Sequence, residues 1–329
     1  MKSLPPKALI AIATAAIPLY PLASASAQEA HWPTRPIKLV VGFPPGGGAD
    51  AVARIYGNKL GELLKQPIVI DNKPGAGTTI AAEQAAAAPG DGYTLYMGSP
   101  ILFGVDKVLY PQIRYDAQSF VPSTRLTSSP MVLVTRTDAP YANAKELAAY
   151  ARQNPGKVFF TSSGNGGSPH LAGALFMKQF GVQLMHVPYK GGSQSVQAVV
   201  AKDADITFAT PPSVLPLVKA GRLKAIAITI KEKNSNMGEI DTIANQTGTP
   251  YDLSFWFGLF APKGTPPAVT QKLFDATQAA MKDPGVVEQL MLQGNDVSLS
   301  SSPQQFAQWV LTQGQAHAKL AQGVEAKVD

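Results

Sequence analysis

Two glycine-rich stretches contain the residues of this sequence that are best suited to hold a ligand. The first, residues 43–50, places three consecutive glycines, Gly46, Gly47 and Gly48, between an apolar run and a helical pattern. Glycine has no Cβ, so a ligand can approach its backbone closely, and a helix N-terminus presents N–H groups without partners and a positive dipole end. The stretch therefore predicts either a cradle for a carboxylate or phosphate, or a tight strand-to-helix connection that binds nothing.

The second stretch, residues 162–167, leads into a helix that Ser168 and Pro169 open. Ser168 is interpreted as the helix N-cap, and proline is favoured at the first helical position. His170 follows in the first turn, where it either contacts a ligand, braces the loop or is purely structural. A serine-hydrolase nucleophile is disfavoured, because the stretch lacks the second glycine of Gly-x-Ser-x-Gly and Pro169 has no N–H for an oxyanion hole.

No other residue pattern indicates catalysis, a metal site or a cofactor. The sequence has no cysteine and four histidines, His31, His170, His186 and His317. None of the histidines forms a pair at metal-ligand spacing, the phosphate-loop pattern is absent, and residues 75–77 match only part of a dinucleotide fingerprint. Asp50 is expected to complement the helix dipole and to hydrogen-bond loop amides if it acts at a site, and Asp205 reads as a turn residue.

Composition and the first residues indicate an exported globular protein. Lys2 and Lys7 precede an apolar stretch, residues 8–22, that two prolines interrupt, and Ala25-Ser26-Ala27 fits the small-x-small cleavage rule. A signal peptide, residues 1–27, is therefore expected, with cleavage after Ala27. The formal net charge is +6, and the cations are scattered rather than clustered, which argues against nucleic acid and suits an anionic small ligand.

The order of elements predicts an α/β protein. Three apolar runs that alternate with helical patterns are expected to be strands, at residues 37–42, 67–71 and 93–97. This order favours a parallel sheet with right-handed crossovers, in which ligands bind beyond the carboxyl ends of the strands. Three turns are expected at that edge: residues 44–50, 75–79 and 98–100.

A second series of strands and helices follows. Strands are expected at residues 131–135 and 157–161, and helices at residues 143–153 and from 168 to Gly181, with further alternation up to residue 229. Residues 231–249 are expected to be irregular. An aromatic strand at residues 255–261 then precedes three helices, which are expected to return to the first domain.

Several short motifs follow one another along the chain. They are Trp32-Pro33-Thr34-Arg35-Pro36-Ile37, Phe43-Pro44-Pro45-Gly46-Gly47-Gly48-Ala49-Asp50, Asn72-Lys73-Pro74-Gly75-Ala76-Gly77, Asp91-Gly92-Tyr93-Thr94-Leu95, Ser168-Pro169-His170-Leu171-Ala172-Gly173, Val187-Pro188-Tyr189-Lys190-Gly191-Gly192 and Trp256-Phe257-Gly258-Leu259-Phe260-Ala261-Pro262. This series resembles the Bug family, the periplasmic substrate-binding proteins of tripartite tricarboxylate transporters. The resemblance covers nearly all of the chain after residue 27.

The resemblance implies a two-lobed periplasmic-binding-protein fold of type II, a Venus flytrap, in which each lobe is a mostly parallel sheet flanked by helices. Residues 28–128 and 252–329 would form lobe 1, and residues 129–251 would form lobe 2, with two crossing strands as the hinge. Loop amides and ordered waters of such proteins hold a small organic carboxylate between the lobes. The implied ligand is a dicarboxylate, a tricarboxylate or an aromatic acid.

The family pattern also implies which residues touch the ligand. They are Phe43, Pro44, Gly46, Gly47, Gly48, Ala49 and Asp50 in the first stretch, Ser163, Gly164, Asn165, Gly166, Ser168 and His170 in the second, and Thr78, Thr79, Ser99, Tyr189 and Asp205 elsewhere. Thr78 and Thr79 stand where members often have Gly-Asn, and Thr210 and Pro211 replace a common Asn-containing run. The chain therefore departs from the family pattern at the far end of the pocket.

The expected function is that of a periplasmic, monomeric solute-binding protein without catalysis, which delivers its ligand to the permease subunits of a tripartite tricarboxylate transporter. Two alternatives remain open. A ligand sensor for a two-component system would use the same binding lobes. A secreted α/β hydrolase would use Ser168 as its nucleophile.

Overall fold

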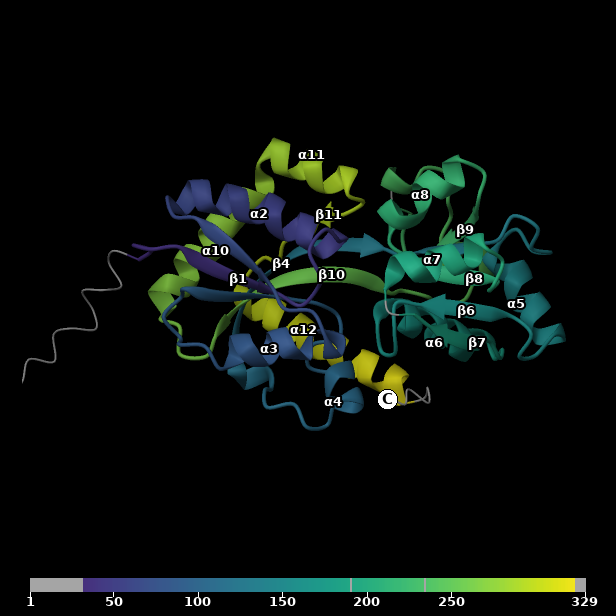
Figure 1. The fold of residues 1–329 in the computed structure, drawn as a ribbon, viewed down its shortest axis with the longest axis horizontal. Coiled ribbons are helices and arrows are strands. Elements are labelled where there is room, and N and C mark those ends of the chain that lie inside the picture. The colour runs from purple at the N-terminus through teal and green to yellow at the C-terminus, as the bar shows by residue number, and fades with distance from the viewer. Residues whose placement is uncertain (1–31, 190, 234, 323–329) are drawn as a thin grey trace, which may run out of the picture. The chain divides into compact units, whose positions relative to one another are not determined.

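Two β-sheets, each flanked by helices, make up this protein in the computed structural model (Figure 1). The structure describes residues 32–189, 191–233 and 235–322, so the expected signal peptide, the cleavage site after Ala27 and His31 lie outside the described residues. Both sheets belong to one compact unit of the chain, which begins at Pro33.

The first sheet begins with three parallel strands, β1 (Ile37–Val41), β2 (Ile68–Asn72) and β3 (Thr94–Gly98). Helix α2 (Gly48–Leu64) connects β1 to β2, and a short 3₁₀ helix (Ala76–Thr78) followed by α3 (Thr79–Ala86) connects β2 to β3. Each helix buries an apolar stripe against the sheet, which is the physical origin of the helical pattern in the sequence. The three predicted turns accordingly follow the carboxyl ends of these strands.

The remaining strands of the first sheet come from the middle and the end of the chain. They are β4 (Phe120–Pro130), β10 (Ser254–Pro262) and β11 (Asp296–Val297), and each pairs antiparallel with its neighbour in the order β11-β4-β10-β3-β1-β2. The sheet is therefore mixed rather than mostly parallel. The reason is that β4 and β10 carry the chain out of this sheet and back into it, so they run in opposite directions.

The second sheet has the order β7-β6-β8-β5-β9. Its strands are β5 (Val132–Thr135), β6 (Phe159–Ser162), β7 (Met185–Pro188), β8 (Ile206–Ala209) and β9 (Lys224–Ile228). Strands β6, β7 and β8 are parallel, whereas β5 runs antiparallel to β8 and β9, so this sheet is mixed as well. Its helices are α5 (Ala144–Gln153), α6 (Ser168–Phe180), α7 (Gly192–Val200), α8 (Pro211–Lys219) and α9 (Ile243–Thr247).

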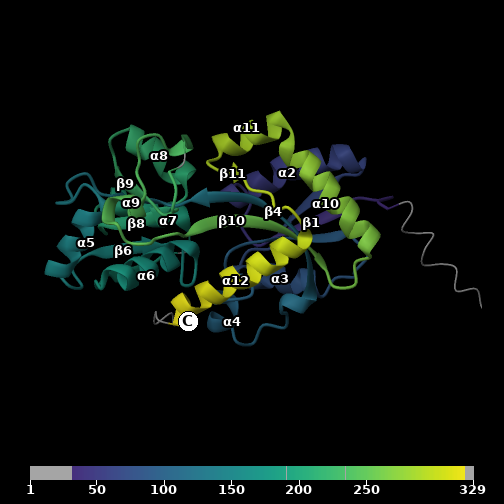
Figure 2. The same ribbon diagram turned by 180° about the vertical axis from the view of Figure 1, so that it is seen from behind.

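The C-terminal helices return to the first sheet, as the sequence predicted. Helices α10 (Pro267–Lys282) and α11 (Pro284–Leu292) pack beside α2, while α12 (Pro303–Gln322) lies on the opposite face with α3 and with the short α4 (Val105–Leu109) (Figure 2). Trp256 of β10 anchors α12 through edge contacts with Phe306 and Trp309. No helix among the described residues is long and apolar enough to cross a membrane.

Several elements were not predicted. Strand β4, helix α4 and strand β11 were not recognised, and helix α9, which Thr242 caps, lies within the segment expected to be irregular. Two further 3₁₀ helices occur at Ala117–Ser119 and Ser235–Met237.

The buried Thr229 connects the two chain segments that link the sheets. Its hydroxyl accepts a hydrogen bond from the Met131 N–H (2.9 Å) and donates one to the Leu253 carbonyl (2.6 Å). Backbone bonds join the same three residues. The outgoing and returning segments are thus tied together at the point where the chain passes from one sheet to the other.

Candidate functional site

The first turn presents open backbone at a helix N-terminus. Gly46, Gly47 and Gly48 are exposed, and a Cβ at Gly46 or Gly48 would have no atom within 4 Å. Packing therefore does not require glycine at these positions, although Gly46 has a φ of +80°. Gly47 is the N-cap of α2 and provides no side-chain cap, so the first amides of this 17-residue helix have no capping side chain. Pro44 is exposed and Ala49 is buried.

The Asp50 side chain holds this turn in place through hydrogen bonds. Its buried carboxylate accepts hydrogen bonds from the Gly46 N–H (2.9 Å), the Arg54 Nε (2.9 Å) and the Asn72 Nδ2 (3.1 Å). The hydrogen bond with Arg54 is the main reason that the pKa of Asp50 lies below its usual value. The expectation that Asp50 would bond to loop amides is confirmed for Gly46. The Arg54 guanidinium partly neutralises the negative charge of Asp50. Asp50 can therefore hold the turn without strongly repelling an anionic ligand.

Asn72, at the end of β2, also fixes the start of the turn. Its Nδ2 donates to the Phe43 carbonyl (3.0 Å) as well as to Asp50. The sequence does not predict a role for Asn72 at the site, although Asn72 opens the motif at residues 72–77. Phe43 itself is half-buried, and its ring meets those of Phe255 and Phe257 edge-on.

Thr78, from the loop after β2, lies against the end of β1. A Cβ on Gly42 would lie 2.5 Å from the Thr78 Cβ, so these two residues pack directly together. Thr78 has a φ of +78°, which is unfavourable for a β-branched residue and marks local strain. Thr79 begins α3, and its hydroxyl donates to the Ala76 carbonyl (2.7 Å). Thr78 therefore borders the first turn, whereas the Thr79 hydroxyl is used within its own loop.

Ser99 follows the carboxyl end of β3, the strand next to β1. Its hydroxyl is buried and has no hydrogen-bond partner within the described residues. Ser123 and Thr127 of β4 have similar unpartnered hydroxyls, so this feature alone does not mark a ligand site. The position of Ser99 beyond the strand end, beside the first turn, is what makes it a site candidate.

The second turn, after β6, is held by hydrogen bonds within itself and to its neighbours. The Ser162 hydroxyl accepts from the Gly164 N–H (3.1 Å) and lies 2.7 Å from the His186 Nε2. The Gly166 N–H donates to the His170 Nδ1 (2.9 Å). Gly164 and Gly166 have φ values of +126° and +73°, which require glycine or impose strain. Gly167 is the N-cap of α6 and, like Gly47, provides no side-chain cap.

Two histidines stack beneath this turn. The rings of His170 and His186 lie 3.9 Å apart at an angle of 9°, and His186 also stacks on Phe160. Burial lowers the pKa of His170 to about 4, and burial together with the neighbouring His170 ring lowers that of His186 to about 3. Both rings are therefore neutral at pH 7. Because the His170 Nδ1 accepts a hydrogen bond, its buried Nε2 carries the proton and has no partner in the described part of the chain.

The arrangement of Ser168 does not resemble an activated nucleophile. Its hydroxyl is buried without a hydrogen-bond partner among the described residues, and His170 directs its acceptor nitrogen to the Gly166 amide instead. The expectation that Ser168 caps α6 is wrong, because Gly167 occupies the N-cap position. The serine that does meet a histidine is Ser162, which is wholly buried and shared with the turn, so that pair braces the loop.

Helix α4, which follows β3 of the first sheet, contacts the second turn. A Cβ on Gly166 would lie 1.9 Å from the Leu109 Cδ1 and 3.0 Å from the Val105 Cγ1. Both contacts come from the short helix that begins a few residues after Ser99. Ser99 therefore lies in the loop between β3 and α4, and α4 contacts the second turn. The sequence did not predict this contact, because a helix of five residues is too short to show a recognisable hydrophobic periodicity.

The remaining residues of the second turn are half-buried, namely Ser163, Gly164 and Asn165. Tyr189, also half-buried, follows β7, and its N–H donates to the Ser162 carbonyl (3.0 Å) at the carboxyl end of β6. Tyr189 thus lies beside the turn as expected. Lys190, from the same motif, lies outside the described residues.

Asp205 is not brought together with the other candidates. It precedes β8, and its carboxylate accepts from the Arg136 Nε (3.0 Å) and the Phe159 N–H (2.8 Å) at the start of β6. The glycine-rich turn lies at the other end of β6, so Asp205 occupies the opposite edge of the sheet. Its role is to hold β6 and the end of β5 together, and the interpretation of Asp205 as a ligand contact does not fit this placement.

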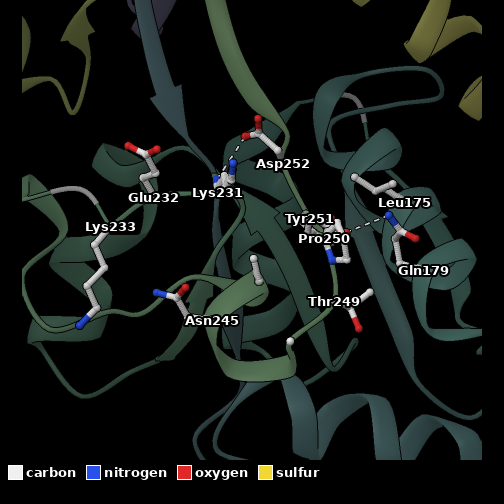
Figure 3. Close-up of a pocket in the computed structure, with 12 residues that line it drawn as sticks. Leu175, Gln179, Lys231, Glu232, Lys233, Asn245, Thr249, Pro250, Tyr251 and Asp252 are labelled. Carbon is white, nitrogen blue, oxygen red and sulfur yellow. Dashed lines mark hydrogen bonds between the residues drawn. The ribbon is translucent and has the colours of Figure 1, made fainter.

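A separate pocket is lined by residues around the second sheet (Figure 3), and no residue of either glycine-rich turn lines it. Residues from α6, the segment after β9 and the segment before β10 line it, including Gln179, Lys231, Asn245 and Asp252. The Gln179 side chain donates to the Pro250 carbonyl, and the Lys231 N–H donates to Asp252. The pocket has a volume of about 810 Å³ and is open to solvent, and none of the predicted site residues lines it.

The model of the tripartite tricarboxylate transporter family receptor matches residues 52–325. A "UPF0065 protein in tcbD-tcbE intergenic region" of Pseudomonas sp. strain P51 is 40% identical over 261 residues, which are 79% of this chain and 77% of that protein. The chain belongs to this receptor family. The family model begins at residue 52 and does not include the first turn, residues 43–50. The role of that turn therefore rests on its geometry in this structure.

Two solved structures that are similar in sequence to this chain have the same fold. The periplasmic binding protein BugD is 30% identical, with a TM-score of 0.77, and the match covers 88% of this chain and 98% of that one. The R. palustris protein Rpa4515, solved with adipate, is 31% identical, with a TM-score of 0.79 and the same coverage. The Bug-family resemblance and the two-lobed periplasmic-binding-protein fold are thus confirmed. The chain is a solute-binding receptor of a tripartite transporter.

Proposed function

We propose that this receptor binds one small organic carboxylate between its two lobes. The carboxylate would accept hydrogen bonds from the first amides of α2, at residues 47–50, and from the turn at residues 163–168. The observation that carries this proposal is the first turn. Gly46 and Gly48 there leave open space beside helix amides that no side chain caps, and the Asp50 carboxylate holds the loop by accepting a hydrogen bond from the Gly46 N–H.

The energetics of such a site are adequate without a cationic side chain. A hydrogen bond to a charged group contributes about 1.5–3 kcal/mol net. Three or four such bonds, together with the exclusion of water on lobe closure, would give about micromolar affinity, or roughly −8 kcal/mol. The uncapped N-termini of α2 and α6 add favourable dipoles from two directions. Rpa4515 was solved with adipate, and malate is bound in another relative of this family.

The domain boundaries form part of the proposal. Residues 28–128 and 252–329 would constitute lobe 1, residues 129–251 would constitute lobe 2, and residues 1–27 would be removed on export. The lobe boundaries agree with the passage of the chain between the sheets near Met131 and Leu253, where Thr229 ties the two segments. A monomer that carries its ligand to membrane permease subunits would complete the cycle.

A thermal-shift screen against monocarboxylates, dicarboxylates, tricarboxylates and aromatic acids tests the ligand class. A ligand that binds only the folded protein raises its melting temperature with concentration. At least one carboxylate is expected to do so, while the matched amides and alcohols should not. If no carboxylate shifts the melting temperature, the proposal is wrong. Co-purification with permease subunits from membranes tests the delivery step.

A further inference from the structure

Three phenylalanine rings form a partly exposed corner beside the first turn. The Phe43 ring lies 6.3 Å from that of Phe255 and 5.9 Å from that of Phe257, and the latter two lie 4.8 Å apart. The three planes are nearly perpendicular, at 76°, 84° and 87°. Phe257 is buried, whereas Phe43 and Phe255 are only half-buried, so this corner has uncovered apolar surface.

The strand register places this corner at the same edge of the sheet as the turn. Val41 pairs with Met97, and Gly98 pairs with Gly258, so Phe43 and the residues of β10 before Gly258 lie beyond the carboxyl ends of β1 and β3. Trp256 packs on α12, and because side chains alternate along a strand, Phe255 and Phe257 point to the other face.

The turns around this corner contain no cationic side chain. Residues 43–50, 75–79, 98–100 and 162–170 include neither lysine nor arginine. Arg54, one turn into α2, is engaged by Asp50. A second carboxylate on the ligand would therefore lose water beside these rings without gaining an ion pair in those turns, whereas an apolar body would lose nothing by desolvation.

We propose that the ligand is an aromatic monocarboxylate, whose ring packs on Phe43 and Phe255 while its carboxylate binds the amides of the first turn. This inference rests on the proposed function and specifies its ligand class. Aromatic pairs favour edge-to-face contact, and the perpendicular corner offers such a contact to an incoming ring. Each ring pair contributes about 2- to 10-fold in affinity beyond the apolar area buried.

Titration calorimetry with benzoate, succinate and adipate tests the proposal on four proteins. These are the wild type, Phe255→Ala, Phe255→Leu and the control Phe159→Ala. Phe159 is also an exposed ring, at the far end of β6 next to Asp205. Benzoate is expected to bind the wild type most tightly, and Phe255→Ala should weaken it about 10-fold or more. Phe255→Leu keeps most of the apolar volume and should lose less, and Phe159→Ala should match the wild type.

The outcomes separate this inference from the proposed function. Tighter binding of succinate or adipate than of benzoate by the wild type, or unchanged benzoate affinity in Phe255→Ala, would overturn the aromatic ligand and leave carboxylate binding intact. If none of the carboxylates of the wider screen binds the wild type, both proposals fail. A normal melting temperature of the unliganded variants excludes unfolding as the cause of lost binding.

Discussion

Replacing Gly47 by aspartate should abolish ligand binding without weakening the fold. Gly47 is the N-cap of α2 with φ −88° and ψ 173°, an extended conformation that any residue adopts. The nearest atom to its missing Cβ is the Pro44 carbonyl oxygen at 3.7 Å, so a side chain fits. An aspartate there would cap the helix by accepting from the same amides that are proposed to hold the ligand.

Gly47→Asp should slightly raise the stability of the fold and strongly lower the affinity for the ligand. Aspartate in place of glycine at an N-cap stabilises a helix by a few tenths of a kcal/mol. Binding would lose two or three hydrogen bonds to a charged partner, or at least about 3 kcal/mol, which is more than 100-fold in affinity. The new charge would also repel the ligand.

Calorimetry with the carboxylate that gives the largest thermal shift measures the loss, and thermal unfolding without ligand measures stability. Gly47→Ala is the matched control, because it adds a Cβ in ordinary van der Waals contact with the Pro44 carbonyl oxygen and no acceptor, so its affinity should remain within a few-fold of the wild type. Gly47→Asn competes for the amides without charge and should lie between the two. An affinity of Gly47→Asp close to that of the wild type would refute the amide cradle.

Three further predictions concern the residues that support the turns. Asp50→Asn should cost about 1–3 kcal/mol at pH 7; because the folded-state pKa of Asp50 is lowered, this stabilisation is lost as pH falls below about 4, and urea unfolding across pH should show the difference shrinking. The pKa values of His170 and His186 fall to about 4 and about 3 on folding, so stability should drop as pH falls from 6.5 to 4, with each histidine contributing up to about 1.4 kcal/mol per pH unit, and His170→Gln should remove the share of His170 from this slope. Gly42→Ala should cost about 1–3 kcal/mol through its clash with Thr78, and Thr78→Gly should restore much of it.

Each of these predictions has a distinct contrary result. A pH-independent difference between Asp50→Asn and the wild type would show that the carboxylate charge does not support the turn. A stability that is flat from pH 6.5 to 4 would mean that His170 is not protected from protonation. If Gly42→Ala lowers stability equally in the presence and absence of Thr78→Gly, the clash with Thr78 is not the cause of the lower stability.

The units of the fold that depend on local sequence were predictable. In β1 with α2 and in β6 with α6, a β-branched or apolar run, a glycine-rich turn and a helical stripe follow each other within about 30 residues. Each signal arises from backbone conformation or from one buried face, so each can be recognised without knowing the rest of the structure. The same holds for the expectation that the turns lie at the carboxyl edges of the strands.

Strand β4 was not predictable in this way. Its buried positions include Ser123, Thr124, Thr127 and Ser129, which give no apolar alternation. Some of these hydroxyls are paired with distant residues; the Ser129 hydroxyl, for example, contacts the Gly294 carbonyl and the Asn295 side chain. A strand with buried hydroxyl side chains, of which Ser129 is paired with a residue 165 positions away, has no apolar alternation that would indicate burial locally.

Asp205 could have been placed better from the sequence itself. It comes before its strand, and the ligand edge of a parallel sheet lies after the strands. The resemblance to the family nevertheless led to the prediction that Asp205 contacts the ligand. The role of α4 at Gly166 could not have been found, because it depends on a five-residue helix meeting a turn about 60 residues further along the chain.

Backbone amide chemical shifts, followed by NMR during titration with the best carboxylate, test the central claim most directly. The two-turn site predicts the largest shifts at residues 47–50 and 163–168, which lie at the N-termini of α2 and α6. Shifts confined to residues around the other pocket, such as Asn245 and Thr249, with the glycine-rich turns unchanged, would contradict it.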